Sequence, residues 1–344
     1  MALSSDSSGN PASLPFPALI ADIGGTNARF GLMSDAMSAV ASNFTIKTGD
    51  YCGIGETIAD MDVKQAQAYP RTVILAVAGP VDGDLIPLTN CPWVIDPRRL
   101  IEDFGFENVI ILNDFEAQAL SLPSLSATDL KPIGRGTEKP QATKLVVGAG
   151  TGLGAATLVF GRDSWIPVAG EGGHIDFGPI HEQDFDIWRV MEKTNARLSA
   201  ETFLSGPGIV RLYQALSTLA DKPASFTKPA EITKAALDER DPIAHKALDL
   251  FCSYLGRYAG DMAIFSLARG GVYLAGGIAP QIALFLKNSS FRKAFEAKAP
   301  HDNLLCKIPT SIITHPNPAL EGLAAYARSP KNFAINLSDR HWTA

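Results

Sequence analysis

The chain has 344 residues, of which 46% are hydrophobic and 19% charged, enough for two domains with a sizeable core. Its formal net charge of -6 offers no basic field for nucleic acid or an anionic membrane, so we expect neither partner. No run approaches the roughly 18 apolar residues of a membrane helix. The four cysteines are scattered without a CxxC pair, which argues against disulfides and a zinc cluster and favours a reducing, cytoplasmic setting.

Residues 1–17 are rich in serine and proline and lack the features of a signal peptide, so we expect a flexible N-terminal tail. After the tail, Val- and Ile-rich runs alternate with helix-like segments, which predicts an α/β architecture. The expected strands are 18–23, 28–33, 72–78, 109–112, 144–148, 155–160, 272–275 and 308–314. The expected helices are 97–104, 115–122, 185–198, 200–219, 243–266 and 320–327.

The first apolar run leads into "DIGGTNARFGL", where Asp22 ends a strand and Gly24-Gly25-Thr26 form a turn. Taken alone, this pattern indicates a β-hairpin with a Gly-Gly turn. A tight glycine turn can also aim backbone N–H groups at an anion such as phosphate, and the threonine hydroxyl adds a donor. Asp22 then has two interpretations: a ligand of Mg²⁺, or a side chain that bonds its own turn.

The stretch "VVGAGTGLGAATLVFG", residues 146–161, repeats this plan, and Gly150-Thr151 matches Gly25-Thr26. Two such hairpins suggest a duplicated protein of two domains with a cleft between them, where ligands usually bind. Together they could grip a polyphosphate from both sides. There is no G-x-x-x-x-G-K-[ST] motif, which excludes a P-loop. Leu153 stands where a dinucleotide motif needs its third glycine, which disfavours that fold.

Polar side chains follow in two further motifs. In "VIILNDFEAQAL", Asn113 and Glu116 have the spacing of a capping box. Asp114, at the carboxyl end of the same strand, is also placed to accept a hydroxyl proton. In "VAGEGGHIDFGP", two glycines separate Glu171 from His174, and this pair suits hydrogen bonding to a polyol.

Two more stretches say little alone. Glu201 in "LSAETFLSGPG" is typical of a carboxylate at a helix N-terminus. The run "VYLAGGIAP", residues 272–280, indicates a strand, a Gly276-Gly277 turn and a helix. These two stretches become informative about function only through their order along the chain relative to the other motifs.

In that order the motifs resemble the bacterial glucokinases, the hexokinase relatives that lack a zinc cluster. The resemblance runs from Ala18 to about Arg328 and also includes "HPNPALEGLAAYA". It implies an actin-like, ribonuclease H-like α/β fold of two domains with an interdomain cleft. The implied small domain is 18–124 plus 315–344, and the large domain is 125–314. The implied reaction is the ATP-dependent phosphorylation of D-glucose at its 6-hydroxyl, giving glucose 6-phosphate and ADP, the first step of glycolysis.

The resemblance also assigns residues. The implied catalytic base is Asp114, and the implied glucose-binding residues are Asn113, Asp114, Glu171, His174 and Glu201. The implied ATP-binding residues are Asp22, Gly24, Gly25, Thr26, Asn27, Gly150, Thr151, Gly152, Gly276 and Gly277. Asp22 is the implied Mg²⁺ ligand, through water. The implied partners are glucose and MgATP in a cytoplasmic homodimer, and zinc is not expected because no cysteine follows His174 in the motif.

The sequence leaves two other functions to be considered. A sugar-sensing regulator would bind hexose without phosphorylating it. Related regulators place a DNA-binding domain ahead of the first hairpin, and residues 1–21 are too short for one. An actin-like ATPase acting on protein partners would need no sugar pocket, so it would leave "GEGGHIDF" without a role.

Overall fold

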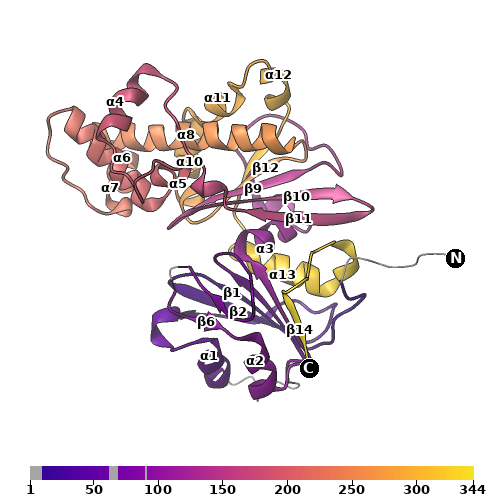
Figure 1. Ribbon diagram of the computed structural model, residues 1–344. Coiled ribbons are helices and arrows are strands. Elements are labelled where there is room, and N and C mark those ends of the chain that lie inside the picture. Colours follow the sequence, from indigo (N-terminus) through magenta and orange to yellow (C-terminus); the bar gives the residue numbers. More distant parts are fainter. Residues whose placement is uncertain (1–9, 62–68, 90) are drawn as a thin grey trace. The chain divides into compact units, whose positions relative to one another are not determined.

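The computed structural model describes residues 10–61, 69–89 and 91–344. Contacts divide the chain into two compact units (Figure 1). Unit 1 comprises Met1–Leu125, Leu158–Ala169 and His315–Ala344, and unit 2 comprises Ser126–Thr157 and Gly170–Thr314. The domain boundaries expected from the resemblance differ from this division, because they place residues 158–169 in the second domain. This segment joins unit 1 because, for example, the Ala334 N–H donates to the carbonyl oxygen of Trp165 at 2.8 Å.

Residues 10–17 lie against unit 1, although we expected them to form part of a flexible tail. Leu14 is buried, and the side-chain amide of Asn10 donates to the carbonyl oxygen of Phe333 at 2.7 Å. The Thr72 hydroxyl donates to the carbonyl oxygen of Pro15, also at 2.7 Å. Hydrogen bonds to backbone carbonyls and the burial of one leucine therefore fix this segment, although its composition is typical of a flexible chain. The remainder of the expected tail, residues 1–9, lies outside the described residues.

Unit 1 contains a six-stranded sheet. Its strands, in spatial order, are β14 (His341–Thr343), β7 (Asn108–Asn113), β4 (Thr72–Val77), β1 (Ala18–Ile23), β2 (Asn27–Met33) and β3 (Ala41–Lys47). Strands β1, β4 and β7 are parallel, whereas β2, β3 and β14 pair antiparallel with their neighbours. The central strands are apolar on both faces, as expected for strands covered on both sides.

Each face of this sheet has its own core, and alternate residues of each strand enter opposite cores. Ile20 packs on one face with α3 (Asp114–Ser121) and α13 (Pro318–Arg328). Leu19 packs on the other with α1 (Ile54–Asp60) and α2 (Pro97–Phe104). Unit 1 is therefore a three-layer α/β/α structure. The pair β5 (Ile86–Pro87) and β6 (Val94–Ile95) forms a small separate sheet.

The second six-stranded sheet has the same strand plan and lies mostly in unit 2, although its segment Leu158–Ala169 is assigned to unit 1. Its strands, in spatial order, are β11 (Ser164–Gly170), β10 (Leu153–Gly161), β9 (Lys144–Ala149), β12 (Val272–Ala275), β13 (Thr310–Ile313) and β8 (Leu130–Pro132). Strands β9, β12 and β13 are parallel, and β8 is an antiparallel edge strand like β14. Two sheets with one order bear out the internal repeat seen in the sequence.

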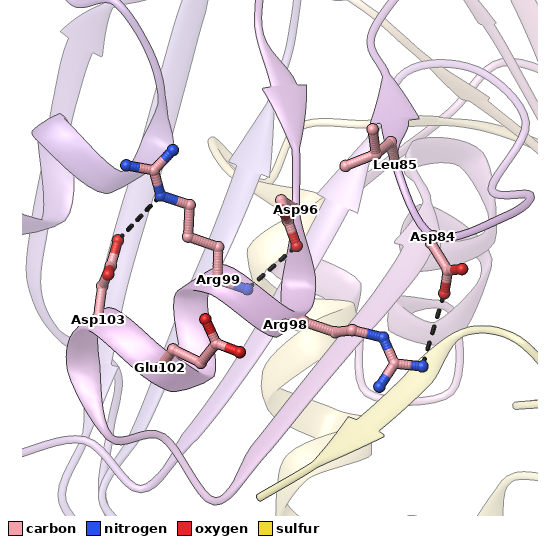
Figure 2. Close-up of a pocket in the computed structure, with 7 residues that line it drawn as sticks. All are labelled: Asp84, Leu85, Asp96, Arg98, Arg99, Glu102 and Asp103. Carbon is pink, nitrogen blue, oxygen red and sulfur yellow. Dashed lines mark hydrogen bonds and ion pairs between the residues drawn. The ribbon is translucent and has the colours of Figure 1, made fainter.

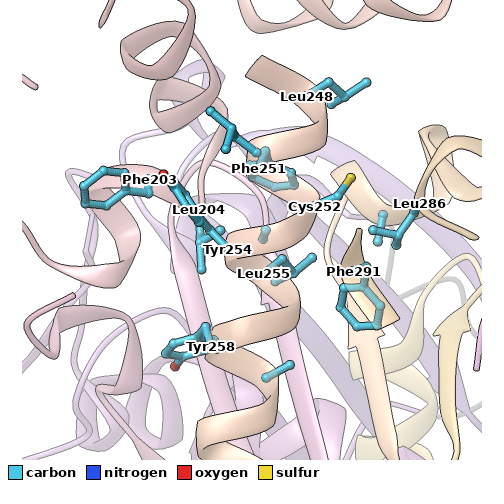
Figure 3. Packing of buried hydrophobic residues seen from close by; sticks show 14 of the residues in the cluster. Phe203, Leu204, Leu248, Phe251, Cys252, Tyr254, Leu255, Tyr258, Leu286 and Phe291 are labelled. Carbon is cyan, nitrogen blue, oxygen red and sulfur yellow. The ribbon is translucent and has the colours of Figure 1, made fainter. Parts of the chain in front are cut away.

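Helices cover the second sheet around a single large core, part of which Figure 3 shows. The long helix α8 (Pro242–Ser266) packs against α6, α7 and α11. The other helices of unit 2 are α4 (Glu182–Val190), α5 (Ala200–Phe203), α6 (Gly206–Leu219), α7 (Pro229–Leu237), α9 (Ile278–Gln281), α10 (Ala283–Asn288), α11 (Phe291–Glu296) and α12 (Asp302–Leu305). No helix within the described ranges is long and apolar enough to cross a membrane.

Two expected helices differ from those observed. The helix expected at 185–198 ends at Val190, because the backbone is already extended at Met191 (φ -69°, ψ 132°). Asn195 and Ala196, with positive φ values of 51° and 62°, exclude a helix farther on. The helix expected at 200–219 is divided into α5 and α6. The Ser205 side chain caps α6 by accepting from the N–H of Gly208 at 3.0 Å, so a new helix starts there.

Candidate active site

In unit 1, the candidate residues lie at the carboxyl edge of the parallel strands. Ile23, Val77 and Asn113 are register partners at the ends of β1, β4 and β7. Neighbouring strands are spaced about 4.8 Å apart, so the backbone at Ile23 and at Asn113 is separated by roughly 10 Å. The turn after β1 and the start of α3 therefore lie at the same edge of one sheet.

Asp22 faces Arg29 across the first hairpin. The two are register partners, and Asp22 Oδ2 lies 3.3 Å from Arg29 Nη1. The Asp22 side chain is only 19% exposed. Burial raises the pKa of Asp22, and the Arg29 charge and hydrogen bond oppose that rise without cancelling it. The carboxylate is thus incompletely compensated by the protein.

The turn of the first hairpin is tied down by hydrogen bonds. The Gly24 N–H donates to the carbonyl oxygen of Asn27 at 3.0 Å. Thr48, at the start of the 3₁₀ helix η1 (Thr48–Asp50), donates to the carbonyl oxygens of both Gly25 and Thr26. The turn is therefore held from the side of η1, and Thr26 is exposed.

Asn113 forms the capping box that its spacing with Glu116 predicts. Its Oδ1 accepts from the N–H groups of Phe115 and Glu116 at 2.9 and 3.2 Å. Its Nδ2 donates to the carbonyl oxygen of Gly79 at 3.2 Å. The cap uses Oδ1, and the bond to Gly79 uses one of the two hydrogens on Nδ2. The second Nδ2 hydrogen is therefore left for a ligand.

Asp114 is the first residue of α3 and is half-buried. Its Oδ1 accepts from the N–H of Phe115 at 3.0 Å, which orients the carboxylate. Behind it, Glu116 is buried and pairs with Arg340 at 2.7 Å. Burial raises the pKa of Glu116, and Arg340 opposes that rise. The helix start thus carries two carboxylates in different surroundings, one half-buried at the strand end and one buried against an arginine.

In unit 2, the second hairpin turn is anchored to Glu201. Glu201 Oε2 accepts from the N–H of Leu153 at 2.9 Å. A Cβ on Gly152 would lie 2.5 Å from the same oxygen, so a glycine lets the carboxylate approach the turn. The Gly206 N–H donates to the carbonyl oxygen of Gly150 at 2.8 Å. Thr151, which lies between Gly150 and Gly152 in the turn, is exposed.

The Gly276-Gly277 turn lies beside this hairpin. Strands β9 and β12 are parallel neighbours with Gly148 opposite Ala275, so both strands end at the same edge. Gly276 has a φ of +80°, and a Cβ there would lie 2.3 Å from the carbonyl oxygen of Ala149. Only glycine fits this position. The expected nucleotide residues of unit 2 are therefore grouped at one edge.

Glu171 and His174 flank a short loop that passes over the same hairpin. Their Oε2 and Nε2 atoms are 3.6 Å apart, and the side chains are 60% and 56% exposed. A Cβ on Gly173 would lie 2.0 Å from the carbonyl oxygen of Leu153. Arg197 also holds the loop by donating to the carbonyl oxygen of His174 at 3.2 Å. Since Leu153 contacts both this loop and Glu201, the three candidate sugar-binding side chains of unit 2 share one support.

A buried tyrosine lies under this loop. Tyr258 of α8 is 1% exposed, and its hydroxyl has no hydrogen-bond partner among the described residues. A Cβ on Gly172 would lie 2.6 Å from that hydroxyl. Burial raises the pKa of Tyr258, so the group stays a neutral phenol. Figure 3 shows Tyr258 farther along α8 than Tyr254 and Leu255.

A buried ion pair supports the chain that follows His174. Asp184 and Arg257 are 3.3 Å apart and almost completely buried. Arg257 also donates to the carbonyl oxygen of Gly178 at 2.8 Å, and its guanidinium stacks over the Phe177 ring. Tyr254 donates its hydroxyl to Asp184 at 2.8 Å. A buried pair with further hydrogen bonds of this kind fixes the local backbone.

The candidate residues thus form two sets, one in each unit. Unit 1 brings together Asp22, the first glycine turn and Asn113-Asp114. Unit 2 brings together the second glycine turn, Gly276-Gly277, Glu171, His174 and Glu201. Sequence reasoning missed several supporting residues, namely Thr48, Gly79, Arg197, Tyr258 and Arg340. Only Gly79 carries a local signal, a Gly-Pro pair directly after an apolar strand.

A separate surface hollow of about 400 Å³ lies at the start of α2 (Figure 2). It contains two ion pairs: Asp84 lies 3.7 Å from Arg98, and Asp103 lies 3.2 Å from Arg99. It contains none of the residues that the sequence singled out. It is lined by Asp84, Leu85, Asp96, Arg98, Arg99, Glu102 and Asp103.

The donor set suits magnesium better than a protein-caged metal. Within the described ranges, no three His, Cys, Asp or Glu side chains gather into a metal site. Magnesium commonly takes one or two carboxylates and fills its remaining positions with water and phosphate oxygens. Asp22 fits that pattern because it is a single, incompletely compensated carboxylate beside a glycine turn.

Comparisons with known proteins agree over almost the whole chain. A family model described as glucokinase matches residues 19–330. A glucokinase from Mesorhizobium japonicum is 49% identical over 332 residues, covering 96% of this chain and 97% of the relative. The crystal structure of a glucokinase from an Antarctic psychrotroph has a TM-score of 0.80 at 31% identity, over 90% of this chain and 98% of the other. That of Balamuthia mandrillaris glucokinase with glucose has a TM-score of 0.75 at 23% identity, over 94% and 95%.

Proposed function

The chain belongs to the glucokinase family, and from this premise we propose how its own residues carry out the family's reaction. That reaction is the transfer of a phosphoryl group from ATP to glucose, so the chain is an enzyme of the kinase class. The fold is the α/β, actin-like fold that the motifs imply. We assign the 6-hydroxyl of glucose as the acceptor, with glucose 6-phosphate and ADP as products.

Asp114 is the proposed general base. It follows the strand end at the carboxyl edge of the sheet, and the N–H of Phe115 orients its carboxylate. A carboxylate at this position can accept a proton from a sugar hydroxyl. As the bond between the sugar oxygen and the γ-phosphorus forms and the bond to ADP breaks, the hydroxyl proton passes to Asp114. This placement is the observation that carries the proposal.

The sugar hydroxyls are proposed to bind Asn113, Glu171, His174 and Glu201. Asn113 retains an Nδ2 hydrogen after capping α3. Glu171 and His174 expose their polar atoms on a loop that close backbone contact holds in place. Carboxylates accept from sugar hydroxyls, and a neutral imidazole can donate or accept. Each of these groups can bind a polyol hydroxyl without a metal.

The nucleotide is proposed to bind at the two glycine turns, with its adenosine end near Gly276-Gly277. Exposed glycine turns whose backbone N–H groups can point at a ligand suit phosphate binding. Asp22 would hold Mg²⁺ through water, and a bound magnesium ion would neutralise phosphate charge. In phosphoryl transfer most of the acceleration comes from such positioning and charge stabilisation.

The first test is Asp114→Ala, measured by ADP release with MgATP and a panel of hexoses. We expect kcat with glucose to fall by about 10²- to 10⁴-fold, because a positioned base is lost. Glucose binding by calorimetry should change little, since the other sugar contacts remain. A mutant that keeps most of its kcat would remove Asp114 from the role of base.

Asp96→Ala is the matched control. Asp96 is also an aspartate at a helix start in unit 1, where it accepts from the N–H of Arg99 at 3.0 Å. Its loss should lower the free energy of unfolding by about 1 kcal/mol, the usual effect of losing an N-cap, without changing kcat. Activity lost in both variants would indicate general damage to unit 1.

We also propose a cytoplasmic location, because four free cysteines suit a reducing compartment. The homodimer implied by the resemblance stays a prediction. The absence of nucleic-acid and membrane partners stays a prediction as well, and it rests on the acidic net charge of -6.

A further inference from the structure

Thr48 is a buried residue that the proposed mechanism does not use, although it contacts the first glycine turn. It is 1% exposed. Its hydroxyl donates to the carbonyl oxygen of Gly25 at 2.9 Å, and its N–H donates to the carbonyl oxygen of Thr26 at 3.0 Å. One residue thus binds two consecutive carbonyls of the turn.

These two bonds set the direction of the turn's N–H groups. A peptide group is planar and trans, so its N–H points away from its own carbonyl. With the carbonyls of Gly25 and Thr26 directed at Thr48, the N–H groups of Thr26 and Asn27 point to the opposite side. Successive N–H groups aimed the same way form an anion-binding site.

Thr48 is itself fixed from the core. The indole N–H of Trp93, which is 1% exposed, donates to the carbonyl oxygen of Thr48 at 3.1 Å. The same N–H lies 3.0 Å from the carbonyl oxygen of Tyr51. A chain of hydrogen bonds therefore runs from a buried tryptophan through Thr48 to the turn.

The second hairpin has a comparable arrangement. The carbonyl oxygen of Gly150 accepts from the backbone N–H of Gly206, the first residue of α6. By the same peptide geometry, the N–H of Thr151 points away from α6. Both turns are thus held by a carbonyl directed inward. A side-chain hydroxyl, that of Thr48, donates to such a carbonyl in the first turn, whereas the side chain that holds the second turn, Glu201, accepts from the N–H of Leu153.

We infer that Thr48 is a positioning residue that presets the N–H groups of Thr26 and Asn27 to receive a phosphate of the nucleotide. This inference rests on the proposed role of the first hairpin. Thr48 does not touch the substrate. Its hydroxyl removes the turn's freedom to rotate its peptide groups, so that the phosphate meets donors already aligned.

The test compares Thr48→Val and Thr48→Ala, which lack the hydroxyl, with Thr48→Ser, which keeps it. Losing a hydrogen bond that orders the turn should raise KM for ATP and Kd for ADP by about three- to tenfold. KM for glucose should stay within error of the wild-type value. Thr48→Ser should restore nucleotide binding close to that of the wild type.

Thr57→Val is the matched control. Thr57 is also 1% exposed in unit 1, and its hydroxyl donates to a backbone carbonyl, that of Gly53, at 3.1 Å. It should lower the thermal midpoint as Thr48→Val does while leaving nucleotide binding unchanged. The inference is overturned if Thr48→Val and Thr48→Ala bind ADP like the wild type, or if Thr57→Val weakens ADP binding equally.

ADP binding by calorimetry separates this inference from the proposed function. Wild-type protein that binds ADP but phosphorylates no hexose would refute the kinase assignment and still allow the Thr48 comparison. Wild-type protein that phosphorylates glucose, with ADP affinity indifferent to the Thr48 hydroxyl, would refute the inference alone. If Thr48→Val fails to fold, Thr48→Ala and Thr48→Ser supply the same comparison.

Discussion

Glycines decide where the candidate sugar-binding loop of unit 2, residues 171–174, can lie. A Cβ on Gly173 would meet the carbonyl oxygen of Leu153 at 2.0 Å, and that backbone atom cannot rotate aside. The side chains of Glu171 and His174 are more than half exposed and make few contacts of their own. The loop is therefore positioned by close backbone approach, while the side chains of Glu171 and His174 stay exposed.

Gly173→Ala tests this dependence. The added methyl must push the loop off β10, which should lower the free energy of unfolding by about 1–3 kcal/mol and raise KM for glucose. Chemical denaturation and steady-state kinetics measure the two effects. Gly170→Ala is the control, because a Cβ there has no atom within 4 Å and should change neither quantity. Equal behaviour of the two variants would show that the contact with Leu153 is unimportant.

At the scale of elements, strand ends place the candidate residues. In both units the parallel strands end together, so residues far apart in sequence reach one edge without special contacts. Local signals located those strands well: the expected 18–23 and 272–275 coincide with β1 and β12. The edge strand β14 was not expected, because a run of three residues has no periodicity to detect.

His341 makes the pairing of β14 sensitive to pH. It is half-buried, its Nε2 lies 2.8 Å from Asn108 Oδ1, and burial lowers its pKa below the ordinary 6.5. As pH falls below about 6.5, the unfolded chain takes up a proton before the folded chain does, so stability present above that pH is lost.

His341→Gln removes this titration. Urea denaturation at pH 7.5 and pH 5.5 should show a wild-type advantage over the variant that is larger at the higher pH. The reason is that only the wild type gains destabilising protonation on acidification. An advantage that is the same at both pH values would mean that His341 does not contribute to the acid sensitivity.

For the whole molecule, duplication is the main architectural fact. Both sheets have the same order of strands, and each contains a hairpin with a Gly-Thr turn. The expected α/β, actin-like fold is confirmed. The sequence made this accessible because two short echoes, at residues 18–33 and 146–161, mark the starts of the two repeats.

The proposed glucose-binding residues lie in both units, so glucose should slow amide exchange near each of them. We expect slower exchange in 113–116 of unit 1 and in 171–176 of unit 2, because sugar contacts restrict local opening. Hydrogen exchange with mass spectrometry measures this, and α2 serves as an internal control that should not change. Protection confined to one unit would contradict the assignment of Asn113, or that of Glu171 and His174, to glucose binding.

The sequence by itself determined what depends on neighbouring residues. Apolar runs and caps act over a few positions, so the capping box of Asn113 and Glu116 could be recognised before the structure. The order of the motifs was enough to identify the family and its reaction. The caps and the individual motifs can be read from the sequence because each involves residues only a few positions apart.

Only the tertiary structure decided which distant groups support them. Arg340 pairs with Glu116 from the far end of the chain, and Thr48 reaches the turn at Gly25 from a different element. Neither contact has a spacing or a periodicity that a sequence could reveal. Such contacts arise from the pairing of strands and the packing of helices, which bring together residues separated by tens or hundreds of positions.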